Sequence, residues 1–191
     1  MRRIPLFLSG LPVVLSGPLL ATGGSLAHAA DSPRLGGLYA ELQVGANGVR
    51  HSELDFVSPL ASASIGTWLY PGIGVEAFVD VELERGADQG FEAGVSRAVG
   101  GALRLSSPSQ DGLRGYIVLG YVDFTVAQQP TRGESRREID ERFSGARLGI
   151  GLQQRLERVP GVLVGAEYRR FFVDEAIHVD GLVLGLRWDV R

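Results

Sequence analysis

Apolar residues occupy every second position in a series of segments, each about ten residues long, that covers most of the chain after residue 30. In the segment 73–83 the apolar phase consists of Ile73, Val75, Ala77, Val79, Val81 and Leu83. A period of two is that of a β-strand whose two faces meet different surroundings, and no segment has a convincing helical period. The alternation therefore predicts eight strands, at residues 38–46, 61–70, 73–83, 96–105, 115–126, 146–156, 162–173 and 182–190.

The connections between these strands differ in length and polarity. Residues 70–74, 106–113 and 157–161 read as tight turns, whereas 47–59 and 128–142 are long and polar; 84–91 and 174–180 are shorter connections on the same side as the long ones. Short turns at one end and longer loops at the other are typical of outer-membrane barrels. The chain is thus predicted to be all-β, an eight-stranded antiparallel up-and-down transmembrane β-barrel.

The orientation of the two faces separates this barrel from a soluble one. A periplasmic lipocalin-like carrier would turn its apolar face inward around a ligand. Here the polar phase is rich in glycine and carries both signs of charge, which favours a narrow, packed lumen with the apolar face toward lipid. The predicted lumen ion-pair network consists of Glu41, Glu76, Asp80, Glu82 and Glu167 with Arg104, Arg147, Arg155, Arg169 and Arg187.

Such a network can be accommodated because arginine forks hydrogen-bond to carboxylates, which offsets part of the cost of burying their charge. A packed electrostatic core is the interpretation that the narrow barrel favours, and a proton path or a gated pore is the alternative.

The stretch "GAEYRRFFVDE", residues 165–175, places charge inside an apolar strand. Alternation sends Glu167 and Arg169 into the lumen and Tyr168 and Phe172 toward lipid. Arg170 then also faces outward, which costs least near the membrane interface. We expect it to contact the phosphates of lipopolysaccharide; a snorkelling side chain or a local bulge that resets the alternation would be the alternative.

Aromatic side chains are expected to mark the two membrane interfaces. Tyr116 and Trp188 lie at the turn-side ends of predicted strands, and Phe124 and Phe172 lie at loop-side ends. Trp68 falls in the polar phase by simple alternation, so the pattern does not settle the facing of its strand.

The first 29 residues read as a secretory signal peptide, with residues 30–191 as the barrel domain. Arg2 and Arg3 precede an uncharged, leucine-rich stretch that is shorter at its apolar centre than a spanning helix and is interrupted by prolines, and "AHA" at 27–29 supplies the small residues of a cleavage site. These features weigh against an N-terminal membrane anchor.

After removal of Arg2 and Arg3, 17 basic residues remain against 22 acids, a net charge of −5, and all of the basic residues are arginines. This balance argues against a nucleic-acid partner. The absence of cysteine excludes disulfides.

The runs "RLGIGLQQRLERVPGVLVGAEYRRFF" at 147–172 and "GLVLGLRW" at 181–188 resemble the small outer-membrane β-barrel family that includes the OmpA transmembrane domain, OmpX, Ail and the opacity proteins. The resemblance implies export to the outer membrane of a Gram-negative bacterium. It also implies insertion by the outer-membrane assembly machinery, which reads the last strand. Gly185, Trp188 and Val190 are similar to that signal, whereas Val183 and the terminal Arg191 depart from it.

Candidate catalytic chemistry is sparse in this sequence. After residue 29 the only histidines are His51 and His178, and the "HVD" at 178–180 is the closest approach to a catalytic arrangement. A lipid A-modifying enzyme using His178 remains the alternative function, and it would need a serine within reach. No cofactor and no metal site are predicted. We therefore expect a non-enzymatic envelope protein with a structural or adhesin-like role, in which the charged loop at 130–142 could bind an extracellular ligand.

Overall fold

The computed structural model describes residues 35–51, 54–84, 86–88, 91–130, 139–174 and 177–190. The expected signal peptide at 1–29 and residues 131–138 of the charged loop lie outside these ranges. The described part of the chain contains no helix long and apolar enough to span a bilayer.

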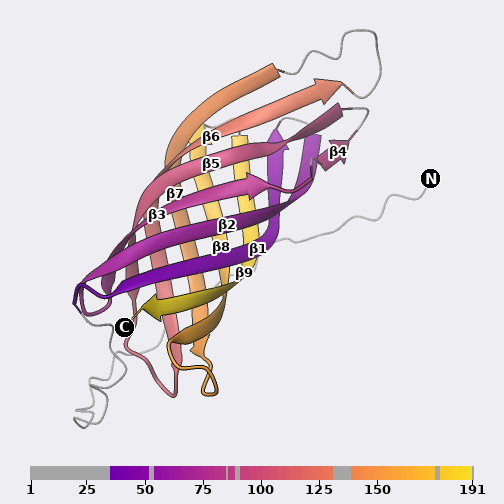
Figure 1. The fold of residues 1–191 in the computed structure, drawn as a ribbon. Helices are drawn as coiled ribbons and strands as arrows, with labels where there is room; N and C mark the ends of the chain where they lie inside the picture. Colours follow the sequence, from indigo (N-terminus) through magenta and orange to yellow (C-terminus); the bar gives the residue numbers. More distant parts are fainter. Residues whose placement is uncertain are drawn as a thin grey trace, which may run out of the picture.

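The described residues form nine strands, of which eight close into a barrel (Figure 1). Each barrel strand pairs antiparallel with its neighbours in the order β3-β2-β1-β9-β8-β7-β6-β5, and pairing between β3 and β5 closes the ring. The short β4 pairs with the start of β5, beyond the end of the β3–β5 pairing. This confirms the predicted eight-stranded up-and-down β-barrel. The strands are β1 (Leu38–His51), β2 (Leu54–Tyr70), β3 (Ile73–Glu82), β4 (Gly86–Asp88), β5 (Phe91–Ser106), β6 (Leu113–Pro130), β7 (Ile139–Arg155), β8 (Val162–Asp174) and β9 (Ile177–Val190).

The strands are longer at their loop-side ends than the alternation predicts. Residues 47–59, expected as a polar loop, instead lie mostly in β1 and β2, which pair as far as His51 and Leu54. Similarly, β6 continues to Pro130 and pairs with β7 as far as Gln128 and Ile139. Backbone pairing needs no apolar face, so it continues where the alternation has ended. In Figure 1 the extended arms of β6 and β7 reach the upper end of the barrel, opposite the C-terminus.

The opposite end is closed by tight turns, as the sequence predicts. Pro71 and Gly72 form the connection between β2 and β3, and Gly72 has a φ of 80°. Glycine adopts this left-handed conformation without the steric cost that a Cβ would bring, and proline favours the position before it.

The apolar face of the barrel points outward. Leu42, Ile65 and Leu184 are representative, since each leaves more than half of its side-chain surface exposed. On either side of Leu42, Glu41 and Gln43 are buried inside the barrel. A lipocalin-like carrier requires the reverse arrangement, so the structure contradicts that alternative.

Two of the aromatic residues expected at the membrane interfaces face the lumen instead. Tyr116 and Phe124 of β6 are buried in the lumen, and Trp68 is buried there too. The prediction failed on β6 because both of its phases are apolar there: the outward phase includes Leu119 and Tyr121. Alternation alone could not tell the two faces apart. Phe172 and Trp188 face outward as expected, with 48% and 38% of their surfaces exposed.

Candidate functional site

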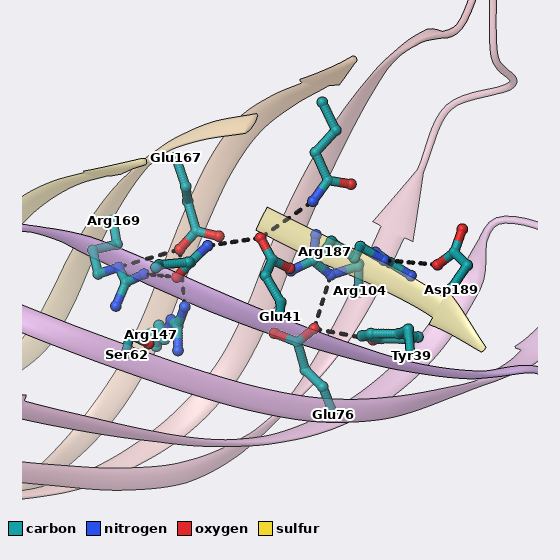
Figure 2. A network of polar contacts seen from close by, with 12 residues as sticks. Tyr39, Glu41, Ser62, Glu76, Arg104, Arg147, Glu167, Arg169, Arg187 and Asp189 are labelled. Carbon is teal, nitrogen blue, oxygen red and sulfur yellow. Dashed lines mark hydrogen bonds and ion pairs between the residues drawn. The ribbon is translucent and has the colours of Figure 1, made fainter. Parts of the chain in front are cut away.

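The turn-side half of the lumen is organised around Arg104 of β5. Its Nη2 lies 2.7 Å from Glu41 Oε2 and its Nε lies 2.8 Å from Glu76 Oε2, and all three side chains are almost completely buried. The hydroxyl of Tyr39 donates to the same Glu76 oxygen at 3.0 Å. Figure 2 shows the two carboxylates pointing at one guanidinium group from β1 and β3. One arginine thus ties together strands that are not neighbours in the barrel.

Arg187 of β9 lies beside this group and is held differently. Its Nε donates to Asp189 at 3.0 Å, and its guanidinium carbon lies 3.7 Å from the centre of the Tyr39 ring and 4.7 Å from that of Trp68. Cation–π contacts of this kind are strongest where water is excluded, and the Arg187 side chain has no exposed surface. Arg104 thus has two carboxylate partners, whereas Arg187 has one carboxylate and two aromatic rings.

A second ionic group lies further along the strands and is centred on Glu167 of β8. Its Oε1 accepts from Arg147 at 2.9 Å and lies 3.3 Å from Arg169 Nε. Arg169 also contacts Asp80 at 3.1 Å and donates to Gln43, while the hydroxyl of Ser62 donates to Asp80. Gln43 in turn donates to Glu41 at 2.9 Å, which connects the two groups into one network (Figure 2).

The structure places the predicted network residues on the inner face of the barrel. Those buried in ion pairs with one another are Glu41, Glu76, Asp80, Arg104, Arg147, Glu167 and Arg169. Arg187 is buried but pairs with Asp189 at the barrel end, and Glu82 and Arg155 lie at strand ends, partly buried and each engaged with neighbouring groups.

Sequence reasoning missed several interior residues that belong to this network or adjoin it. Arg114 is buried, and Gln43 and Gln153 both donate to Glu41. The two glutamines belong to the polar phases of their predicted strands. Arg114 shares the phase of Tyr116 but precedes the predicted strand at 115–126 by one residue. If each predicted strand had been extended to the adjoining turn, Arg114 would have been included.

Inward glycines make room for the large interior rings. An added Cβ at Gly151 of β7 would overlap the Tyr116 ring on β6, and one at Gly66 of β2 would overlap the Tyr39 ring on β1. Each ring thus occupies the space that a side chain on the next strand would need. The glycines of the polar phase therefore leave room for bulky side chains that project from the neighbouring strands.

The loop-side half of the lumen is apolar. Phe124 packs against Phe143 and Phe171 with ring centres 5.7 and 5.8 Å apart. On β5, β6, β8 and β9 these apolar residues lie farther from the tight turns than the buried arginines do. The cluster contains Phe78, Val95, Ala98, Val122, Phe124, Phe171 and Val179, with Ala102 and Phe143 packed against it.

Described side chains thus occupy both halves of the lumen. The two halves meet where the Arg147 guanidinium carbon lies 4.0 Å from the centre of the Phe78 ring. An eight-stranded barrel is only wide enough for side chains to fill it. In the part of the chain that the structure describes, no group of three acidic or histidine side chains could hold a metal ion. The side chains of His51 and His178 lie outside the described residues, so the catalytic alternative is not tested there.

Among the described strand residues, the outward-facing charges lie toward the loop-side rim. Arg170 faces outward, as the alternation predicts, and its Nε lies 2.8 Å from Asp180 Oδ1 on β9. The Tyr168 hydroxyl donates to the same oxygen at 2.6 Å. On the neighbouring strands β7 and β6, Arg142 donates to both oxygens of Asp123 at 2.7 to 3.0 Å.

No protein-family model and no curated protein matches this sequence. Solved structures do match, with low identity and nearly complete coverage of the other chain. Neisserial surface protein A is 14% identical with a TM-score of 0.59, over 80% of this chain and 96% of its own. Ail of Yersinia pestis, in complex with the heparin analogue sucrose octasulfate, is 12% identical with a TM-score of 0.58, over 81% and 99%.

The N-terminal barrel domain of OprF from Pseudomonas aeruginosa is 16% identical with a TM-score of 0.50, over 78% of this chain and 97% of its own. At such identities the likeness concerns the fold alone. The expected resemblance to the small outer-membrane barrels is confirmed at that level, and the fold is one that spans the outer membrane.

Proposed function

We propose that this protein is a non-enzymatic barrel of the outer membrane that acts at the cell surface through its loop-side end. The observation that carries the proposal is the filled lumen, in which paired charges occupy one half and packed aromatic rings the other. A barrel without an open channel serves transport poorly. The strands are joined by tight turns at the other end, so the longer loop-side end offers the larger surface outside the bilayer.

The length of the strands supports an exposed loop-side end. On β6 the outward apolar residues end at Tyr121, yet pairing with β7 continues to Gln128. A membrane strand needs about 9 to 11 residues, so the ends of β6 and β7 extend past the bilayer. These arms would present the charged segment at 130–142 to the medium, as an adhesin-like surface for an extracellular ligand. The heparin analogue bound to Ail makes a sulfated polysaccharide a suitable first probe.

Two further partners belong to the proposal. The lipids of the outer membrane, including lipopolysaccharide, would contact the apolar exterior. The outer-membrane assembly machinery would read β9, whose Trp188 faces outward near the C-terminal end of the strand.

The test combines conductance with surface binding. The folded protein in planar bilayers is expected to show no steady channel current. Cells displaying it are expected to retain labelled heparin, and a variant lacking residues 131–138 should lose that binding while keeping its heat-dependent shift on an SDS gel. An open channel, or equal heparin retention by the deletion variant, would contradict the proposal.

The enzymatic alternative predicts a modified lipid A, and this product distinguishes it from the proposed function. If His178 served a lipid A-modifying reaction, His178→Ala would change the lipid A mass profile of expressing cells. We expect identical profiles for the wild type, the variant and cells without the protein.

A further inference from the structure

The apolar outer surface ends in charge on three adjacent strands, β5, β6 and β7. Along β5 the outward residues run through Leu103 and Val99 to Arg97. Along β6 they run through Leu119 and Tyr121 to Asp123. Tyrosine favours the level of the lipid headgroups. The charged residues just beyond Tyr121 therefore lie at the outer membrane–water boundary.

Two arginines lie in one cross-strand row at this level. Thr125 of β6 is the direct partner of Arg97 on one side and of Arg142 on the other. All three belong to the outward phase. Neighbouring strands are about 4.8 Å apart, so the two arginine Cα atoms are about 10 Å apart. Their long side chains can converge over the threonine between them.

The charges in this row do not balance. Both oxygens of Asp123, the acid that follows Tyr121 in the outward phase of β6, accept from Arg142. Arg97 is exposed and makes no ion pair with a described side chain, and Arg142 keeps 76% of its side-chain surface exposed. Among the described side chains, the positive charge of Arg97 is thus left without a partner at the headgroup level.

The outward arginine on the next strand, β8, is different. Arg170 contacts Asp180 through Nε at 2.8 Å and Nη2 at 3.3 Å, and 38% of its side-chain surface is exposed. Its charge is balanced by a carboxylate from the neighbouring strand. From its place in "EYRRFF", Arg170 is the residue that the sequence led us to expect at the lipopolysaccharide phosphates. Its ion pair with Asp180 leaves it less unused hydrogen-bonding capacity than Arg97, so we assign the phosphate contact to Arg97 instead.

We propose that Arg97, Thr125 and Arg142 bind a phosphate group of the phosphorylated glycolipid in the outer leaflet. A guanidinium fork matches a phosphate in shape and charge, and a hydroxyl between two forks adds a further donor. We infer a lipid-borne phosphate because the site lies on the barrel wall just beyond Tyr121 and faces the headgroup layer. The proposal rests on the outer-membrane location of the proposed function, but it does not depend on the surface role assigned to the loops.

The test uses the folded full-length barrel in zwitterionic detergent, titrated with bisphosphorylated lipid A and followed by native mass spectrometry. Arg97→Gln is expected to weaken binding about tenfold, the loss of one charge-assisted contact. Arg170→Gln is the matched control, an outward arginine at the same rim, and should change the Kd by less than about twofold. Because Arg97 is exposed, its replacement should leave the heat-dependent gel shift intact.

Two further probes identify the source of the phosphate. Dephosphorylated lipid A should bind equally weakly to the wild type and Arg97→Gln, and inorganic phosphate at millimolar concentration should not displace the bound lipid. The proposal is overturned if Arg97→Gln binds lipid A as the wild type does, if Arg170→Gln loses as much, if the dephosphorylated lipid binds equally well, or if inorganic phosphate displaces it.

Discussion

The two halves of the lumen fill the same narrow barrel by different physical means. The turn-side half is held by charged groups that reach across the barrel, such as Arg104 between Glu41 and Glu76. The loop-side half is held by ring packing around Phe124. In the first half a side chain matters through its charge and its partners. In the second it matters through its volume.

This difference sets how each half responds to substitution. A buried ion pair contributes little net stability relative to a well-packed apolar substitute, yet removal of one partner leaves the other charged and unpaired. An apolar cluster loses stability in proportion to the cavity that a substitution creates. The ionic half should therefore recover when a whole ionic group is replaced, and the apolar half only when volume is restored.

The largest effect is expected at Arg104. Arg104→Met leaves Glu41 and Glu76 buried without their arginine, which should lower the free energy of unfolding by about 3 to 5 kcal/mol. Urea unfolding in micelles, followed by the fluorescence of the buried Trp68, measures the change. The control adds Glu41→Gln and Glu76→Gln to the same chain and should regain most of the loss. If the triple variant is no more stable than Arg104→Met, charge is not what organises this half.

A somewhat smaller effect is expected in the apolar half. Phe124→Ala removes the ring that packs against Phe143 and Phe171 and should cost about 3 kcal/mol in the same assay. Phe124→Leu keeps most of the volume and should recover more than half of that loss. Equal stability of the alanine and leucine variants would show that packing does not support the loop-side half.

The smallest loss of unfolding free energy is expected at the inward glycines. Gly151→Ala places a methyl group against the Tyr116 ring and should cost about 1 to 3 kcal/mol through overpacking. Gly101→Ala is the matched control, because Gly101 is exposed and the nearest atom to an added Cβ is 3.7 Å away. Its unfolding free energy should stay within about 0.5 kcal/mol of the wild type. Similar losses in both variants would mean that backbone effects dominate over crowding.

Several features of the candidate site were predictable from single strands. On β8 the alternation separates Glu167 and Arg169 from Tyr168 and Arg170, and the structure has the same assignment. The prediction failed on β6, where Tyr116 and Phe124 were expected at the membrane interfaces. Both phases of that strand are apolar, so its orientation follows from pairing with its neighbours, among them β7, whose polar phase is clear.

The sequence by itself determined the class of fold, the number of barrel strands and, on most of them, which phase faces lipid, because a period of two and the turn residues are local properties. Only the tertiary structure decided which charges meet. Glu41 and Arg104 lie 63 positions apart in the chain. Their contact depends on the closure and stagger of the ring, which no single strand encodes. The same holds at the rim, where Asp180 balances Arg170 and no described acid pairs with Arg97.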